Sequence, residues 1–126
     1  MDKKQIVTEF WEQVILQSSE GMKQFFADGA YVRWHNTNEH FSEEEYIRAN
    51  CEYPGKWRGE VERMEQLEDL VISVVRVWPE DGAASFHAVS FFAFCGDKIA
   101  VIDEYWGDDG AAPQWRLDKQ IGRPII

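Results

Sequence analysis

The residues with the clearest chemical potential end an apolar run near the C-terminus, in the stretch VIDEYW at positions 101–106. Asp103 and Glu104 are adjacent carboxylates there, and Tyr105 and Trp106 follow them directly. Because side chains alternate between the two faces of a strand, Asp103 and Glu104 are predicted to lie on opposite faces. A carboxyl group held among apolar side chains has a raised pKa and can serve as a general acid or base near neutral pH. The stretch therefore indicates either a carboxylate available for chemistry or a structural ion pair.

A second group of polar residues follows the first predicted strand. His35, Glu39 and His40 lie close together in the sequence, with Asn36 between them. Their spacing matches no zinc signature, so we interpret the histidines as hydrogen-bonded residues and expect no metal site. Asn36 is a candidate for the rim of a pocket. The sequence contains no Gly-x-Ser-x-Gly nucleophile elbow, phosphate-binding loop or dinucleotide fingerprint, and we expect no cofactor.

Length and charge limit the classes of protein and of partner. The 126 residues fit one domain spanning 1–126. The formal net charge of −10 argues against nucleic acid and anionic membranes as partners, because both are negatively charged. We find no apolar run of membrane-spanning length and no signal-peptide pattern, so we expect a cytoplasmic location. In that reducing compartment Cys51 and Cys95 are predicted to be buried free thiols.

Hydrophobic periodicity and turn residues define the elements that must position these groups. Helices are predicted over 3–18, 20–27 and 43–52, the last beginning with a capping box formed by Ser42 and Glu45. Strands are predicted over 30–35, 58–66, 69–78, 85–95 and 98–106. Short connections make the later strands antiparallel neighbours. The predicted class is α+β, with the helices packed on one face of an antiparallel sheet.

The strand FHAVSFFAF, residues 86–94, is apolar on both faces. A strand of this kind must be covered on both sides. The few predicted helices cover one face only. A second copy of the chain is the simplest cover for the other, and we therefore expect a homodimer through the outer face of the sheet.

The order of elements resembles the nuclear transport factor 2-like superfamily and, within it, the SnoaL-like branch. The resemblance is carried by Phe26-Ala27-Asp28-Gly29, by Trp34-His35-Asn36 and by Lys98-Ile99 with Glu104-Tyr105-Trp106, and it covers about residues 5–110. It implies a cone-shaped curved sheet wrapped around about three helices, with a pocket inside. This fold carries isomerases, dehydratases, cyclases, epoxide hydrolases and binding modules, so the resemblance does not define a reaction.

The resemblance also implies which side chains face the cone. Glu104 matches the position where epoxide hydrolases of this fold carry a catalytic aspartate. Trp34 stands at the position of the general base of ketosteroid isomerases, and Ser90 at the position of their oxyanion-stabilising acid. Tryptophan cannot act as that base, and serine donates a weaker hydrogen bond than that acid, so isomerase activity is not expected. The implied pocket consists of Val32, Trp34, Asn36, Tyr53, Trp57, Ser90, Phe92 and Trp106.

Glu104 is then the candidate catalytic acid or base, and an ion pair with Arg76 or Arg33 is the structural alternative. Tyr53 and Trp57 are candidates for a lid at one end of the pocket. The tail is expected to bring Trp115 and Arg116 back across the sheet. The sequence favours a protein that binds a small apolar or amphipathic molecule. An acid/base enzyme using Glu104 (a hydrolase, dehydratase or cyclase) and a protein-interaction domain are the alternatives.

Overall fold

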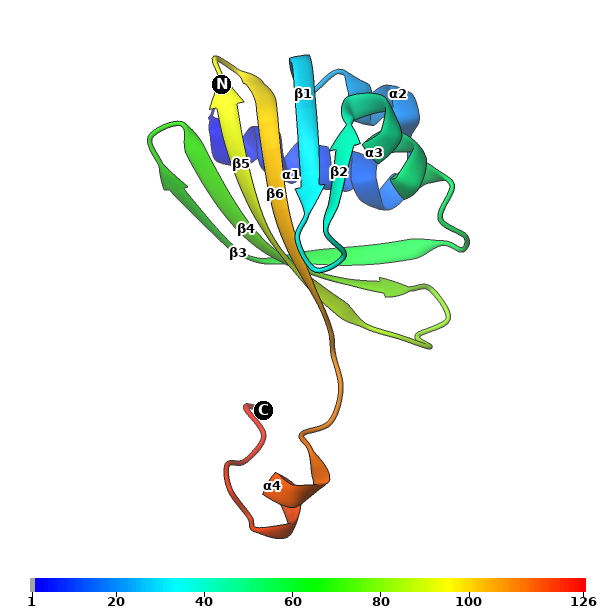
Figure 1. Ribbon diagram of the computed structural model, residues 1–126, viewed down its shortest axis with the longest axis vertical. Helices are drawn as coiled ribbons and strands as arrows, with labels where there is room; N and C mark the ends of the chain where they lie inside the picture. The colour runs from blue at the N-terminus through cyan, green and yellow to red at the C-terminus, as the bar shows by residue number, and fades with distance from the viewer. Residues whose placement is uncertain (1) are drawn as a thin grey trace.

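The computed structural model describes residues 2–126 and shows three helices packed against one face of a strongly curved sheet (Figure 1). The elements in chain order are α1 Lys3–Leu16, α2 Ser19–Lys23, β1 Phe26–Trp34, β2 Glu39–Ser42, α3 Glu43–Cys51, β3 Trp57–Leu67, β4 Leu70–Pro79, β5 Phe86–Cys95, β6 Lys98–Asp108 and α4 Gln114–Asp118. The α+β class predicted from the sequence is confirmed.

The sheet has six strands in the order β2-β1-β6-β5-β4-β3, and it is not closed into a barrel. Neighbouring strands are antiparallel except β1 and β6, which run parallel, with Trp34 paired to Glu104. The expectation of a wholly antiparallel sheet is therefore wrong at this pair. Because β1 and β6 are separated by most of the chain, their pairing follows from tertiary packing rather than from a short connection.

The first strand begins earlier than predicted. The predicted helix 20–27 ends at Lys23, and β1 starts at Phe26. Phe26 is buried in the core, where its ring lies 5.4 Å from that of Phe10, and this packing favours extended backbone over helix. Gly29 has a φ of 75°, which glycine adopts freely, and it lies where the pairing of β1 with β6 is interrupted. The short strand β2 falls in the run predicted as a polar loop.

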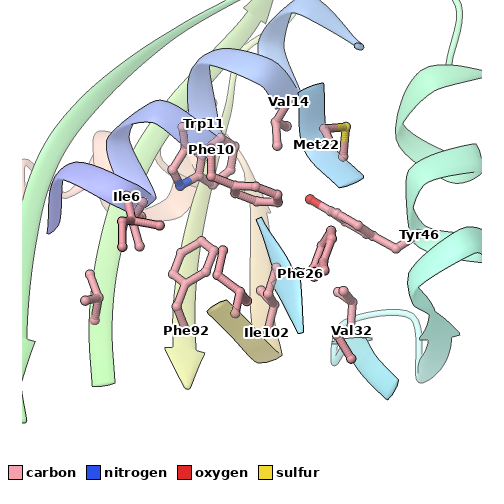
Figure 2. Close-up of a cluster of buried hydrophobic side chains, with 14 of the residues drawn as sticks. Ile6, Phe10, Trp11, Val14, Met22, Phe26, Val32, Tyr46, Phe92 and Ile102 are labelled. Atoms are coloured by element: carbon pink, nitrogen blue, oxygen red, sulfur yellow. The ribbon is translucent and has the colours of Figure 1, made fainter. Parts of the chain in front are cut away.

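The core lies between α1 and the concave face of the sheet (Figure 2). Phe10 of α1 contacts Phe92 of β5 edge to face, with ring centroids 5.8 Å apart. Tyr46 of α3 closes the core from the other side at 2% exposure. The capping box of Ser42 and Glu45 at the start of α3 is confirmed by hydrogen bonds in both directions.

The convex face of the sheet has no cover within the described chain. Along β4 and β5 the side chains alternate between buried positions facing the helices and half-buried positions on the outside. The outward apolar residues of these strands include Ile72, Val74, Val89 and Phe91. The prediction that β5 is apolar on both faces is confirmed by this arrangement.

The C-terminal end of the chain leaves the domain altogether (Figure 1). Residues 110–126, which we term the C-terminal arm, contain α4 and extend away from the sheet, and every one of them is exposed. The expectation that Trp115 and Arg116 return across the sheet is therefore wrong. Cys95 is exposed at the end of β5 and Cys51 is partly buried, so the prediction of two buried thiols is also wrong. None of the helices described is both long and apolar enough to cross a membrane.

Candidate functional site

A cavity of about 360 Å³ lies between α1, α3 and the adjoining ends of β4, β5 and β6. Its wall is formed by Trp11, Val14, Ile15, Gln17, Trp34, Asn36, Thr37, Ala49, Asn50, Tyr53, Trp57, Val77, Phe86, Trp106 and Asp108. A cavity of this size holds a small organic molecule, at the lower end of the range seen for ligand pockets.

The cavity wall is mainly aromatic, and its rings come from several elements. Trp34 and Trp106 lie on the neighbouring strands β1 and β6, with their rings 6.4 Å apart at an interplanar angle of 72°. On the opposite side Trp57 packs against Tyr53 at 5.2 Å and against Phe86 at 6.0 Å. Faces and edges of aromatic rings bind apolar groups well, and ring faces also attract cations.

The amide groups in the wall have their N–H groups already bonded. Gln17 Nε2 donates to the carbonyl oxygens of Asn50 and Tyr53, both at 2.9 Å. Asn50 Nδ2 donates to the Val14 carbonyl oxygen at 3.0 Å. These bonds fix the orientation of both amides, so Gln17 Oε1 and Asn50 Oδ1 remain as acceptors.

Three of the four indole N–H groups of the wall, those of Trp11, Trp34 and Trp57, are used in the same way. Trp11 Nε1 donates to Ser73 Oγ at 3.1 Å, and Trp57 Nε1 donates to the Pro54 carbonyl oxygen at 3.2 Å. Trp106 Nε1 is buried without a hydrogen-bond partner. The indoles therefore offer a ligand their ring surfaces rather than donors.

Charge in the wall has one sign. Asp108 is the only lining residue of the described chain that is charged at neutral pH, and no lysine or arginine lines the cavity. Asn36 supports the wall beside it, because its Oδ1 accepts a hydrogen bond of 2.8 Å from the Trp106 backbone N–H. The cavity therefore combines apolar rings with acceptor oxygens and one carboxylate.

Glu104 lies directly behind this wall, at 1% exposure. Its Oε2 accepts a 2.6 Å hydrogen bond from Ser90 Oγ, and its Oε1 accepts one of 2.9 Å from Trp34 Nε1. Burial raises the pKa of Glu104, while the hydrogen bonds from Ser90 and Trp34 partly oppose that rise. Glu104 is thus a hydrogen-bonded carboxyl group whose neutral form is favoured by its surroundings.

Neither predicted arginine pairs with Glu104. Arg33 Nε lies 2.6 Å from Asp103 Oδ1 on the convex face, and Arg76 Nε donates to Ser85 Oγ at 2.9 Å. The hydrogen bond from Arg33 holds the pKa of Asp103 below its usual range, with burial opposing it and His35 adding to it. The two adjacent carboxylates occupy opposite faces of β6 and have opposite pKa shifts.

The structure divides the residues expected in the pocket into two groups. Trp34, Asn36, Tyr53, Trp57 and Trp106 line the cavity. Val32, Ser90 and Phe92 have no exposed surface and form the core beneath it, because α1 packs over that part of the sheet. Glu104 lies in this second group, separated from the cavity by the Trp34 indole.

Several wall residues were not expected from the sequence. Trp11 lies on the apolar face of α1, and its ring belongs to both the core and the cavity wall. Gln17 and Asn50 come from the ends of α1 and α3, and nothing in their spacing indicates that they meet. Asp108 lies two residues beyond the end of the last predicted strand, and its pairing in register with Phe86 places both residues at the cavity. Its spacing from Glu104 and Trp106 on the same face of the strand is the signal that could have indicated the rim.

Comparison with known proteins gives the fold. No protein-family profile matches the chain, and no curated protein matches it. A protein from Kribbella flavida provisionally assigned as a ketosteroid isomerase has a similar structure, with a TM-score of 0.82 at 17% identity over 98% of this chain and 90% of that one. A SnoaL-like polyketide cyclase, also provisionally assigned, from Shewanella putrefaciens gives 0.70 at 10% identity over 84% and 90% of the two chains.

A third similar structure is a hypothetical protein from Catenulispora acidiphila with a ketosteroid isomerase-like fold, solved in complex with trimethylamine. It has a TM-score of 0.69 at 12% identity and covers 79% of this chain and 83% of that one. The chain therefore has the nuclear transport factor 2-like fold, as the sequence resemblance implied. At these identities the similarity defines the architecture and leaves the reaction open.

Proposed function

We propose that this protein binds a small amphipathic molecule in the aromatic cavity, and that the polar end of the ligand is a hydrogen-bond donor or a positive charge. The observation that carries the proposal is the composition of the wall. Six of its residues are aromatic, one is a carboxylate and none is cationic. This refines the expectation of an apolar or amphipathic ligand.

The polar atoms of the wall support a donor or cation. Gln17 and Asn50 have used their N–H groups on backbone carbonyls, which leaves acceptor oxygens. Asp108 adds a negative charge at the rim. A cation over an aromatic face gains about 0.5–2 kcal/mol, depending on its desolvation. An anionic ligand would meet no positive group in this wall.

A structural neighbour supports the same chemical class. The protein from Catenulispora acidiphila was solved in complex with trimethylamine, a small basic amine. The fold can therefore accommodate an alkylated amine. For the present chain we infer the class from its own wall residues, and the neighbour agrees with that class.

Three matched probes test this proposal by isothermal titration calorimetry at neutral pH: choline, its neutral carbon isostere 3,3-dimethylbutan-1-ol, and the anion 3,3-dimethylbutanoate. We expect choline to bind about tenfold more tightly than the neutral isostere, because tenfold corresponds to about 1.4 kcal/mol, within the range of a cation–ring interaction. The anion should bind most weakly. Equal affinity for choline and its isostere would contradict the charge preference and leave an apolar pocket, whereas no binding of any probe would contradict the pocket function.

Two variants locate the binding. Trp57→Leu should lower choline affinity several-fold, because it removes a ring from the wall. Trp78→Leu removes an indole from the convex side of β4, outside the cavity, and should leave affinity unchanged. If both variants bind alike, the probe does not occupy the aromatic cavity.

The second candidate function is an acid/base enzyme that uses Glu104. It is favoured by the raised pKa of this buried carboxyl group next to the cavity. The Trp34 side chain would have to turn aside for Glu104 to reach a ligand, since its indole N–H bonds to the carboxylate. The variant Glu104→Gln separates the two candidate functions once a converted substrate has been found by screening. Loss of substrate turnover with retained choline binding supports the enzyme, and retained substrate turnover contradicts the catalytic role of Glu104.

We propose that the protein assembles as a homodimer through the convex face of the sheet. The support is the row of half-buried apolar side chains on β4 and β5, which the helices leave uncovered. Phe91 and Tyr105 pack edge to face at its centre, with rings 6.0 Å apart. A contiguous apolar surface of this kind marks an interaction site.

A further inference from the structure

The C-terminal arm is structured but has no cover from its own chain. Trp115, Leu117 and Ile121 keep 56%, 50% and 54% of their surface exposed. The arm nevertheless has internal order, since the backbone N–H of Ile121 donates to the Arg116 carbonyl oxygen at 3.0 Å. Figure 1 shows that α4 lies far from the sheet. Apolar side chains on an ordered segment of this kind need a partner surface to exclude water.

Asp109, the residue just before the arm, is held to residues at the start of β5. The backbone N–H of Asp109 donates to the Ser85 carbonyl oxygen at 3.0 Å, and the Asp109 carboxylate accepts a hydrogen bond from Ser85 Oγ. The same carboxylate contacts His87 Nδ1, whose Nε2 lies 2.8 Å from Glu62 Oε1. These contacts fix the position from which the arm starts.

The arm and the domain have opposite charges. Residues 110–126 contain Arg116, Lys119 and Arg123 and one anion, Asp118, for a net charge of +2 with histidine neutral. Because the whole chain has a net charge of −10, the remaining residues carry a net charge of −12. This difference in sign favours attraction between the arm and the domain of another copy.

The convex face offers matching groups for such an arm. Glu60 and Glu65 on the edge strand β3 pair in register with Arg76 and Ile72 of β4, which lie on the outward side. Ile72 and the adjacent Val74 are half-buried apolar residues on the same side. Arg63 faces Val74 and its Nε lies 3.0 Å from Glu65 Oε2, so this part of the sheet combines an apolar strip with charges of both signs along its edge.

We infer that the arm of each copy docks on the β3–β4 side of the convex face of a second copy. Trp115, Leu117 and Ile121 lie against the apolar strip. A second copy is the occupant because every chain carries both the arm and the apolar strip, the arm and the rest of the chain have opposite net charges, and the arm extends away from its own sheet (Figure 1). The exchange goes beyond the sheet dimer proposed above: the arm covers the outward β4 residues, and the two sheets meet on the β5–β6 side around Phe91 and Tyr105.

The test uses the full-length chain with the photo-reactive residue benzoylphenylalanine in place of Trp115. On irradiation we expect covalent adducts at twice the chain mass, with peptides of β3 or β4 found by mass spectrometry. The same residue in place of Leu16, which is 71% exposed at the end of α1, is the control and should give no dimer-mass adduct. Adducts confined to a single chain mass would show that the arm packs on its own domain and would overturn the inference.

A second measurement follows the strength of association. The double variant Trp115→Ser with Leu117→Ser should weaken dimerisation at least tenfold by analytical ultracentrifugation, with an unchanged circular dichroism spectrum. Lys119→Glu should weaken it and reduce its salt dependence, because it removes a cation from the interface. Lys56→Glu, in the loop before β3, is the matched charge control.

The two dimer proposals remain distinguishable in these experiments. If the double variant dimerises as tightly as the unmodified chain, the arm exchange is wrong and the sheet dimer stands. A monomeric unmodified chain at micromolar concentration overturns both. Neither result bears on ligand binding in the cavity, which the choline titration measures separately.

Discussion

At the scale of single residues, Glu104 is the only acidic side chain of the described residues that is buried. Its carboxyl group is buried and has no cationic partner, only hydrogen bonds from Ser90 and Trp34. Removing either donor leaves a buried acceptor less well satisfied, a change that costs about 1–3 kcal/mol. The residue therefore links stability to pH whether or not the protein is an enzyme.

Glu104→Gln should change the pH dependence of stability in a defined direction. Burial raises the pKa of Glu104 above its ordinary value of 4.5, so the folded protein favours the protonated form. Its contribution to stability is complete below about pH 4.5 and is lost as the pH rises through the raised folded pKa. The variant cannot ionise, and its free energy of unfolding should lack this decline.

The measurement is urea denaturation of both proteins at intervals from pH 4 to pH 8. The stability of Glu104→Gln relative to the unmodified protein should increase with pH over this range. Glu12→Gln, on the exposed side of α1, is the control and should run parallel to the unmodified protein. A Glu104→Gln profile that also runs parallel would contradict the raised pKa.

The sequence predicted part of the surroundings of Glu104. Strand alternation correctly separated it from Asp103, because the period of a strand is local. It did not predict the hydrogen bonds, since Ser90 and Trp34 are 14 and 70 positions away. The predicted ion pair of Glu104 with Arg33 or Arg76 was wrong for the same reason. The sequence shows which arginines are present, but it does not show that Arg33 pairs with Asp103 across the parallel strands β1 and β6.

At the scale of elements, the contact of α1 with β3 determines the shape of one side of the cavity. Gly59 of β3 lies under Ile15 of α1, and a Cβ atom at Gly59 would be 2.6 Å from Ile15 Cδ1. Ile15 is itself a wall residue. The absence of a side chain at Gly59 therefore allows α1 to approach the sheet closely.

Gly59→Val should destabilise the protein by about 1–3 kcal/mol, the usual cost of overpacking a filled site. The midpoint of urea denaturation measures this change. Gly107→Val is the matched control, because Gly107 also lies in a strand and a Cβ atom there meets nothing within 4 Å. Equal stability of the two variants would show that α1 moves away at no cost.

Helices and strands were predicted correctly where their hydrophobic pattern extends over many residues. Helix α1 and the strands β4, β5 and β6 were located from periodicity and turn residues, because each has many side chains on a defined face. The start of β1 and the whole of β2 were missed. Both are determined by contacts with distant residues, such as that of Phe26 with Phe10, and short segments carry little periodic signal.

At the scale of the whole molecule, the uncovered convex face is the feature that most limits the possible assemblies. Phe91→Asp places a charge at its centre, next to Tyr105, and should dissociate the proposed homodimer at micromolar concentration, because burying an unpaired charge is strongly unfavourable. Light scattering coupled to size exclusion measures the mass. Leu16→Asp, on an exposed position away from this face, should leave it unchanged. Identical masses for both variants would contradict the sheet interface.

The sequence predicted the need for a cover on this face and misplaced the tail. Apolar alternation on both faces of β5 is a property of one strand, so it could be detected without the fold. The path of the arm depends on Asp109, Ser85 and His87 meeting at its root. The large apolar residues Trp115, Leu117 and Ile121 indicate that the arm binds a surface. Their identity does not show whether that surface belongs to the same chain or to a second copy.

The parallel pairing of β1 with β6 also has a consequence for how the chain folds. Trp34 and Glu104 are partners in register although 70 positions separate them, and the sheet cannot be completed until nearly the whole chain is available. Contacts of such long range slow folding, because the entropy of closing the intervening loop is lost before the contact forms. During synthesis the edge of β1 that faces away from β2 therefore stays unpaired until β6 has been made. An N-terminal segment in that state is exposed to aggregation, and co-translational chaperones should matter more for this chain than for a helical protein of the same length.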